Sequence, residues 1–155
     1  MPDDGKKVMR EMDSSDDESW HKVSLRVIGD AVPLDDLGPM LGIEPTIIGR
    51  KGEHIGGAAD RAIYDTNIWM WAYPASARVP FETQISALLD RLEPHRSSLR
   101  EFFSSSGVEG ELFLGFSSAN GQGAAYFSRE ILERIVSFGF SITIDLYPPG
   151  EGDSE

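Results

Sequence analysis

The feature that most limits what this chain can fold into is one long apolar stripe at helical spacing between residues 81 and 103. Its members are Ile85, Leu88, Leu89, Leu92, Leu99, Phe102 and Phe103. The stripe keeps its phase across Pro94, because the step from residue 92 to residue 99 is one heptad. Since proline interrupts a helix, we expect one kinked helix or two nearly collinear helices that share a single apolar face.

Four segments alternate apolar with polar or aromatic residues and are predicted to be strands, namely 20–29, 67–73, 112–116 and 140–147. In the second of these, Trp69, Trp71 and Tyr73 form one face, which we expect the long helix to cover. The dipeptide Asn120-Gly121 predicts a hairpin turn that pairs the third strand with residues 124–127.

Two further helices are predicted, one before the long stripe in the sequence and one after it. The first has the apolar positions Leu34, Leu37, Met40 and Leu41 and ends at Gly42. The second follows the N-cap Ser128, ends at Gly139 and has the inner face Ile131, Leu132, Ile135 and Val136. Because Leu-Gly-Ile at 41–43 and Phe-Gly-Phe at 138–140 each follow a strand and a helix, a loose internal repeat is also predicted. The pattern predicts an α+β fold, with a mostly antiparallel sheet and two to three helices packed mainly on one face.

Charge divides the chain into three parts. Residues 1–18 carry three basic and seven acidic side chains, and residues 150–155 add three carboxylates, so −5 of the formal charge of −12 remains on the middle. We predict a disordered acidic tail over 1–19, a single domain over 20–149 and an acidic tail over 150–155. An acidic domain repels phosphate polymers, so nucleic acid is disfavoured and a basic protein partner is favoured.

Composition also restricts the chemistry. The absence of cysteine excludes disulfides and thiolate chemistry, and the three histidines (His21, His54 and His95) share no metal-ligand spacing, so neither a metal nor another cofactor is expected. No apolar run is long enough to span a bilayer and no secretory signal is visible, which predicts a cytoplasmic protein without membrane contact. We expect a non-enzymatic protein. The alternative is an enzyme whose active site includes His54 and the neighbouring Glu53.

Residues 46–55 contain the spacing Ile-Ile-Gly-x-x-Gly-x-x-Ile around Arg50 and Lys51. This spacing resembles the Gly-x-x-Gly loop of KH domains, which implies that single-stranded nucleic acid binds where bare backbone at Gly49 and Gly52 meets phosphates. Pro45 leaves barely one turn for the helix that should enter such a loop. Two glycines, at 56 and 57, would also weaken the helix that should leave it.

The other interpretation of residues 44–67 is a loop or broken hairpin that connects the first helix to the tryptophan strand. A short helix with the face Ile55, Ala59, Ala62 and Ile63 is a further alternative. Under any of these interpretations the segment holds the densest positive charge of the predicted domain. The candidate ligand-binding residues are therefore Gly49, Arg50, Lys51, Gly52, His54 and Trp69.

A wider resemblance follows the chain in order. Its motifs are Leu25-Arg26-Val27-Ile28-Gly29-Asp30, Leu41-Gly42-Ile43-Glu44-Pro45-Thr46, Arg50-Lys51-Gly52, Trp69, residues 88–94, residues 128–132 and Ile144-Asp145-Leu146-Tyr147. Together they resemble the bacterial family known as domain of unknown function 4279, over residues 22–148. The resemblance implies no catalytic residue, because the family has no established activity. We therefore expect a protein-interaction domain. By analogy with small acidic families that accompany bacterial toxins, it could take the form of an immunity protein. The alternative is a domain that binds single-stranded nucleic acid through Gly49 and Gly52.

Overall fold

The computed structural model describes residues 19–148, and the two predicted tails lie outside the described residues except for Ser19. Five strands form one mixed sheet in the order β2-β3-β1-β4-β5. They are β1 (Trp20–Ile28), β2 (Ile47–Gly49), β3 (Ile68–Ala72), β4 (Glu109–Ser117) and β5 (Phe140–Leu146). All pairings are antiparallel except that of β4 with β5, which is parallel. The predicted α+β class with a mostly antiparallel sheet is confirmed.

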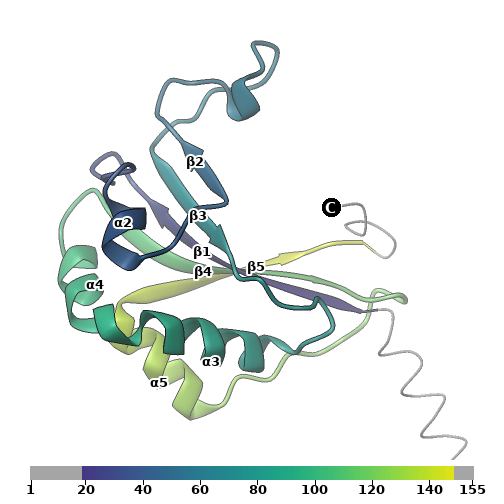
Figure 1. Cartoon of the computed structure of the whole chain (residues 1–155). Helices are drawn as coiled ribbons and strands as arrows, with labels where there is room; N and C mark the ends of the chain where they lie inside the picture. The colour runs from purple at the N-terminus through teal and green to yellow at the C-terminus, as the bar shows by residue number, and fades with distance from the viewer. Residues whose placement is uncertain (1–18, 149–155) are drawn as a thin grey trace, which may run out of the picture.

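Three helices of eight or more residues lie on the same face of the sheet (Figure 1). They are α3 (Phe81–Leu92), α4 (Arg96–Phe103) and α5 (Arg129–Phe138), and a shorter helix, α2 (Leu37–Leu41), follows β1. A short 3-10 turn, η2 (Glu93–His95), separates α3 from α4, so the predicted break at Pro94 is confirmed. None of the helices described between residues 19 and 148 is long and apolar enough to cross a bilayer.

The core fills the space between this helix layer and one face of the sheet. Residues paired across neighbouring strands point to the same face, so Leu25, Trp71 and Leu112 share the covered face. On that face Leu25, Trp69 and Leu112 are completely buried, as are Ile85, Leu88, Leu89, Leu92 and Leu99 from the helix stripe. Trp69 is thus buried in the same apolar cluster as the stripe, and Trp71 and Tyr73 pack against that cluster.

Within residues 19–148, the opposite face of the sheet carries no helix (Figure 1). It presents the even-numbered residues of β1 and β3 and the odd-numbered residues of β4, as the register shows. We call this surface the open face. Because a sheet with one bare face leaves that face free for contacts, the open face is the first place to look for a site.

Two details of the sequence prediction are wrong. Residues 124–127 form no strand, because the chain from Ser118 to Ser128 must leave the plane of the sheet and reach the helix layer, where α5 begins. The strand that pairs with β4 on that side is β5 instead. Leu132 and Val136, assigned to the inner face of α5, are exposed, whereas Ile131, Ile135 and Phe138 are buried.

The predicted ends of α5 are confirmed, since the Ser128 hydroxyl accepts a hydrogen bond from the Ile131 N–H and Gly139 has a φ of 85°. Helix α2 ends in the same manner at Gly42, with a φ of 66°. The strands that follow the two helices pair differently, because β5 lies beside β4 whereas β3 separates β2 from β1. The internal repeat therefore stays a prediction.

Candidate functional site

The segment from residue 47 to residue 68 forms an arm that projects from the sheet, on the side away from α3, α4 and α5 (Figure 1). The arm is a broken hairpin. Gly52 N donates to Tyr64 O, Tyr64 N donates to Glu53 O, and Ile55 N donates to Ala62 O, each at 2.9 Å. The only helical element described within it is the short 3-10 turn η1, Ile55–Gly57. The arm therefore lacks the helix–loop–helix that a KH-like clamp requires, and that alternative is wrong. The alternative of a short helix from Ile55 to Ile63 is also wrong.

The two glycines of the KH-like spacing have structural duties in the arm. A Cβ at Gly49 would lie 2.5 Å from the Cε1 atom of Tyr64, so the glycine makes room for this ring against the strand. Gly52 has a φ of +88°, which glycine adopts without strain, and it forms the turn after β2. These observations explain both glycines without a phosphate ligand.

Arg50 and Lys51 of the arm are paired with carboxylates in the segment between β1 and α2. Arg50 Nη2 lies 2.6 Å from Asp35 Oδ1, and Lys51 Nζ lies 2.9 Å from Asp30 Oδ2. The hydrogen bond from Lys51, a second one from Thr66 and the charge of Lys51 lower the pKa of Asp30 below its ordinary value of 3.8. Because exposed ion pairs contribute little to stability, these two pairs orient the arm more than they stabilise the fold.

His54 and Glu53 lie near the tip of the arm and are both exposed. The Nδ1 atom of His54 lies 2.7 Å from the carbonyl oxygen of Arg61. A carbonyl only accepts, so Nδ1 carries the proton that is donated and Nε2 is the nitrogen left for a ligand. Between residues 19 and 148, no group of three His, Asp or Glu side chains is placed to hold a metal ion.

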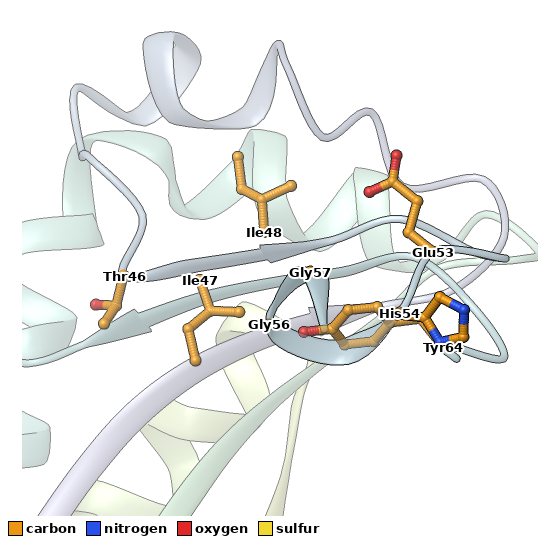
Figure 2. Close-up of a pocket in the computed structure, with 8 residues that line it drawn as sticks. All are labelled: Thr46, Ile47, Ile48, Glu53, His54, Gly56, Gly57 and Tyr64. Atoms are coloured by element: carbon orange, nitrogen blue, oxygen red, sulfur yellow. The ribbon is translucent and has the colours of Figure 1, made fainter. Parts of the chain in front are cut away.

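A hollow of about 580 Å³ opens along the arm, and we call it the arm hollow. Figure 2 shows Ile47 and Tyr64 on one side of the hairpin and Ile48 on the other. The residues that line the arm hollow are Thr46, Ile47, Ile48, Glu53, His54, Gly56, Gly57 and Tyr64. Four isoleucines of the arm are at least 36% exposed, namely Ile47, Ile48, Ile55 and Ile63. The arm therefore presents an apolar surface rather than a basic one.

A second hollow, of about 400 Å³, lies on the open face, and we call it the open-face groove. It is lined by Trp20, Lys22, Ser24, Thr46, Ile47, Met70, Ala72, Phe113, Gly115 and Tyr147. Thr46 and Ile47 line both hollows, so the two are continuous at the start of β2. The result is one concave surface that runs from the arm onto the sheet.

Aromatic and cationic side chains are held together along this groove. The ring centroids of Trp20 and Tyr147 are 5.1 Å apart, and Lys22 Nζ lies 5.2 Å from the Trp20 ring centroid. Farther along β1, Arg26 lies over the Phe113 ring at 4.7 Å. Cation–π pairs such as the last two contribute about 0.5–1 kcal/mol each at exposed sites, and all three contacts join side chains of the open face.

The residues predicted from the sequence divide into two groups. The structure brings Gly49, Arg50, Lys51, Gly52 and His54 together on the arm, with His54 facing the hollow. Trp69 lies apart from them, completely buried on the covered face of the sheet, where its Nε1 has no hydrogen-bond partner among the described residues. Trp69 is therefore part of the core.

The residues of the open-face groove were missed, because they come from separate strands. The groove takes Trp20 from β1, Met70 from β3, Phe113 from β4 and Tyr147 from the end of β5. The only sequence signal for this groove was that each of these strands carries a large apolar residue at an outward-facing position. Alternation alone does not tell which of the two faces a helix layer leaves open.

One comparison with known proteins gave a match. A family model described as domain of unknown function (DUF4279) matches residues 18–149. No curated protein and no solved structure matches the chain. The match covers most of the 155 residues and confirms the family resemblance seen in the sequence motifs. The chain therefore belongs to the DUF4279 family, whose function is unknown.

Proposed function

We propose that this chain is a non-enzymatic binding domain that holds one protein partner in the arm hollow and the open-face groove. The observation that carries the proposal is the continuity of the two hollows at Thr46 and Ile47. A single partner surface can reach both, because the two hollows share these lining residues. The cytoplasm as the place of action, and an immunity protein that neutralises a toxin as the biological form, belong to the same proposal.

The chemistry of the surface supports a protein partner. Its walls are aromatic and aliphatic, with Trp20, Phe113 and Tyr147 at one end and Ile47 and Ile48 of the arm at the other. Aromatic residues are enriched at the centres of protein–protein interfaces, where a few of them carry most of the binding energy. Phe113 and Tyr147, which are half-buried and can still lose water on binding, are therefore the residues we expect to contribute most.

The charge of the arm also supports a protein rather than a nucleic acid. Residues 47–68 contain three basic and three acidic side chains, and Arg50 and Lys51 already have carboxylate partners. Binding to single strands depends on a positive groove that neutralises phosphates, and the arm has no net charge to offer. Asp36 and Glu44 are exposed near the base of the arm, which suits a partner with a basic rim.

Site-specific photo-crosslinking in the cells that carry the gene tests this proposal. A benzophenone amino acid is placed at His54 in the arm hollow, at Met70 in the open-face groove and, as a matched control, at Thr83 on the exposed side of α3. We expect the first two positions to capture the same protein and the control position to miss it. Capture of nucleic acid at His54, or of nothing that the control does not also capture, would overturn the proposal.

The captured protein is then purified, and its affinity for the whole chain is measured by calorimetry. Ile47 lines both hollows and is 42% exposed, so we expect Ile47→Asp to weaken binding at least about tenfold, which corresponds to about 1.4 kcal/mol. Thr83→Asp places the same charge outside the surface and should leave the affinity unchanged. Equal losses in the two variants would contradict the proposed site.

A further inference from the structure

The edge of the sheet formed by β5 presents backbone N–H and C=O groups that pair with no other strand of the described chain. β5 pairs with β4 and has no strand on its outer side within the described chain. Tyr147 N donates to Phe116 O at 2.9 Å, so the odd-numbered residues direct their backbone groups toward β4. By alternation, the N–H and C=O groups of Ile142, Ile144 and Leu146 point outward.

This edge lacks the devices by which proteins protect an exposed strand. β5 is seven residues long, Phe-Ser-Ile-Thr-Ile-Asp-Leu, contains neither lysine nor proline, and carries a single charged residue, Asp145. Charged residues, proline and short length are what usually prevent such an edge from pairing with another strand. The opposite edge, β2, is only three residues long. β5 is therefore the edge that can accept a strand.

Apolar side chains line the same edge beneath the strand. Ile144 is 52% exposed and Leu146 is 72% exposed, both on the side of the sheet that carries the helices. Helix α5 adds Leu132 and Val136, on the flank opposite Arg134, whose guanidinium reaches Asp90 of α3 at 2.8 Å. We call these four side chains the β5 ledge. With the four arm isoleucines, they make up eight of the ten exposed large apolar residues in the described chain.

We propose that the β5 ledge joins a second copy of this chain, through antiparallel pairing of β5 with β5. A twofold axis at Thr143 pairs all seven residues of the strand, from Phe140 opposite Leu146 to Ile142 opposite Ile144 of the second copy. The same register places Asp145, the only charged residue of the strand, opposite Ser141 rather than opposite its own copy.

A second copy suits this edge because the edge is complementary to itself. Each copy offers outward backbone groups of one strand to those of the other, and each brings the same apolar flank of α5 to the same side. The axis runs through the sheet, so both helix layers lie on one face and both open faces on the other. The dimer leaves the arm hollow and the open-face groove accessible, and it does not depend on the proposed function.

Sedimentation equilibrium tests the dimer directly. At about 100 µM, where a dimer with a micromolar dissociation constant is nearly complete, we expect twice the 17.1 kDa mass of the chain. The double variant Ile144→Lys/Leu146→Lys should sediment as a monomer while it keeps the circular dichroism spectrum of the wild type. Ile63→Lys is the matched control, because Ile63 is 50% exposed and lies on the arm, and it should remain a dimer. A monomeric wild type overturns the proposal.

A single engineered cysteine tests the register, since the chain contains none of its own. Thr143 directs its backbone groups toward β4, so in the dimer the two copies of Thr143 form a non-hydrogen-bonded pair with Cα atoms about 4.5 Å apart, within the range of a disulfide. Under mild oxidation we expect Thr143→Cys to give a covalent dimer and Ile63→Cys to stay monomeric on a non-reducing gel. A wild-type dimer whose Thr143→Cys variant does not cross-link would show that a different surface joins the copies.

Discussion

At the scale of single residues, Asp30 holds the base of the arm. It follows β1, and its carboxylate accepts hydrogen bonds from Lys51 Nζ at 2.9 Å and Thr66 Oγ1 at 2.8 Å. These bonds lower its pKa, so the native state favours the ionised carboxylate more than the unfolded state does. The stabilisation is therefore present above pH 3.8 and is lost as the pH falls through the lowered native pKa.

We predict that Lys51→Met raises the pKa of Asp30 toward 3.8, because the variant removes both the main hydrogen-bond donor and the neighbouring positive charge. A pH titration of the Asp30 carboxyl carbon by NMR measures this directly. Thr66→Val, which removes only the second hydrogen bond, should produce a smaller rise. An Asp30 midpoint that is the same in wild type and Lys51→Met would show that the contact is absent in solution.

At the scale of elements, α5 is held at both ends by its neighbours. Ser128 Oγ accepts from Ile131 N at 3.1 Å, while Glu82 of α3 accepts from Ser128 N at 2.9 Å. At the other end, Arg100 of α4 donates to the carbonyl groups of Val136 and Ser137, each at 3.3 Å. Because a helix leaves several backbone groups unpaired at each end, these contacts anchor α5 to the helix layer.

We predict that Ser128→Ala lowers the free energy of unfolding by about 1 kcal/mol, the usual loss when an N-cap hydroxyl is removed. Urea denaturation measures this value. Ser97→Ala is the matched control, since Ser97 is exposed within α4 and caps no helix, and its effect should stay within about 0.5 kcal/mol. Equal effects of the two substitutions would mean that the cap does not stabilise α5.

At the scale of the whole molecule, the two faces of one sheet have different duties. Leu25 points from β1 into the core and is completely buried, whereas Met70 points from β3 into the open-face groove and is half-buried. Both side chains are apolar and of similar size. The fold therefore relies on one face for stability, whereas the other face supplies the surface that we propose for a partner.

We predict that Leu25→Ala lowers the free energy of unfolding by about 2–5 kcal/mol, because it opens a cavity in the core. Met70→Ala should cost about 1 kcal/mol, since the methionine is already partly in contact with water. Chemical denaturation of both variants decides the matter. Comparable losses would show that the open face is packed in solution, which would contradict its assignment as a binding surface.

Much of this arrangement could be predicted, because the signals for it are local. Alternation in 20–29 and 67–73 marked two strands, and the apolar stripe through Pro94 marked the helix layer that packs on the sheet. Ser128 and Gly139 marked the ends of α5, since capping depends on residues within one turn of each other. For the site, the sequence indicated the arm, but it did not show that Arg50 and Lys51 are already paired with carboxylates some 15 to 21 residues away.

Hydrophobic periodicity determines which residues of a segment share a face, because that depends only on the geometry of the segment itself. It does not determine which strand lies next to which, and so residues 124–127 were paired with β4 where β5 lies instead. The choice of face is equally non-local. Trp69 is buried and Met70 lines the groove only because α3, α4 and α5 all pack on one side. Tertiary packing alone decided that the arm and the outward residues of four strands meet in one concave surface.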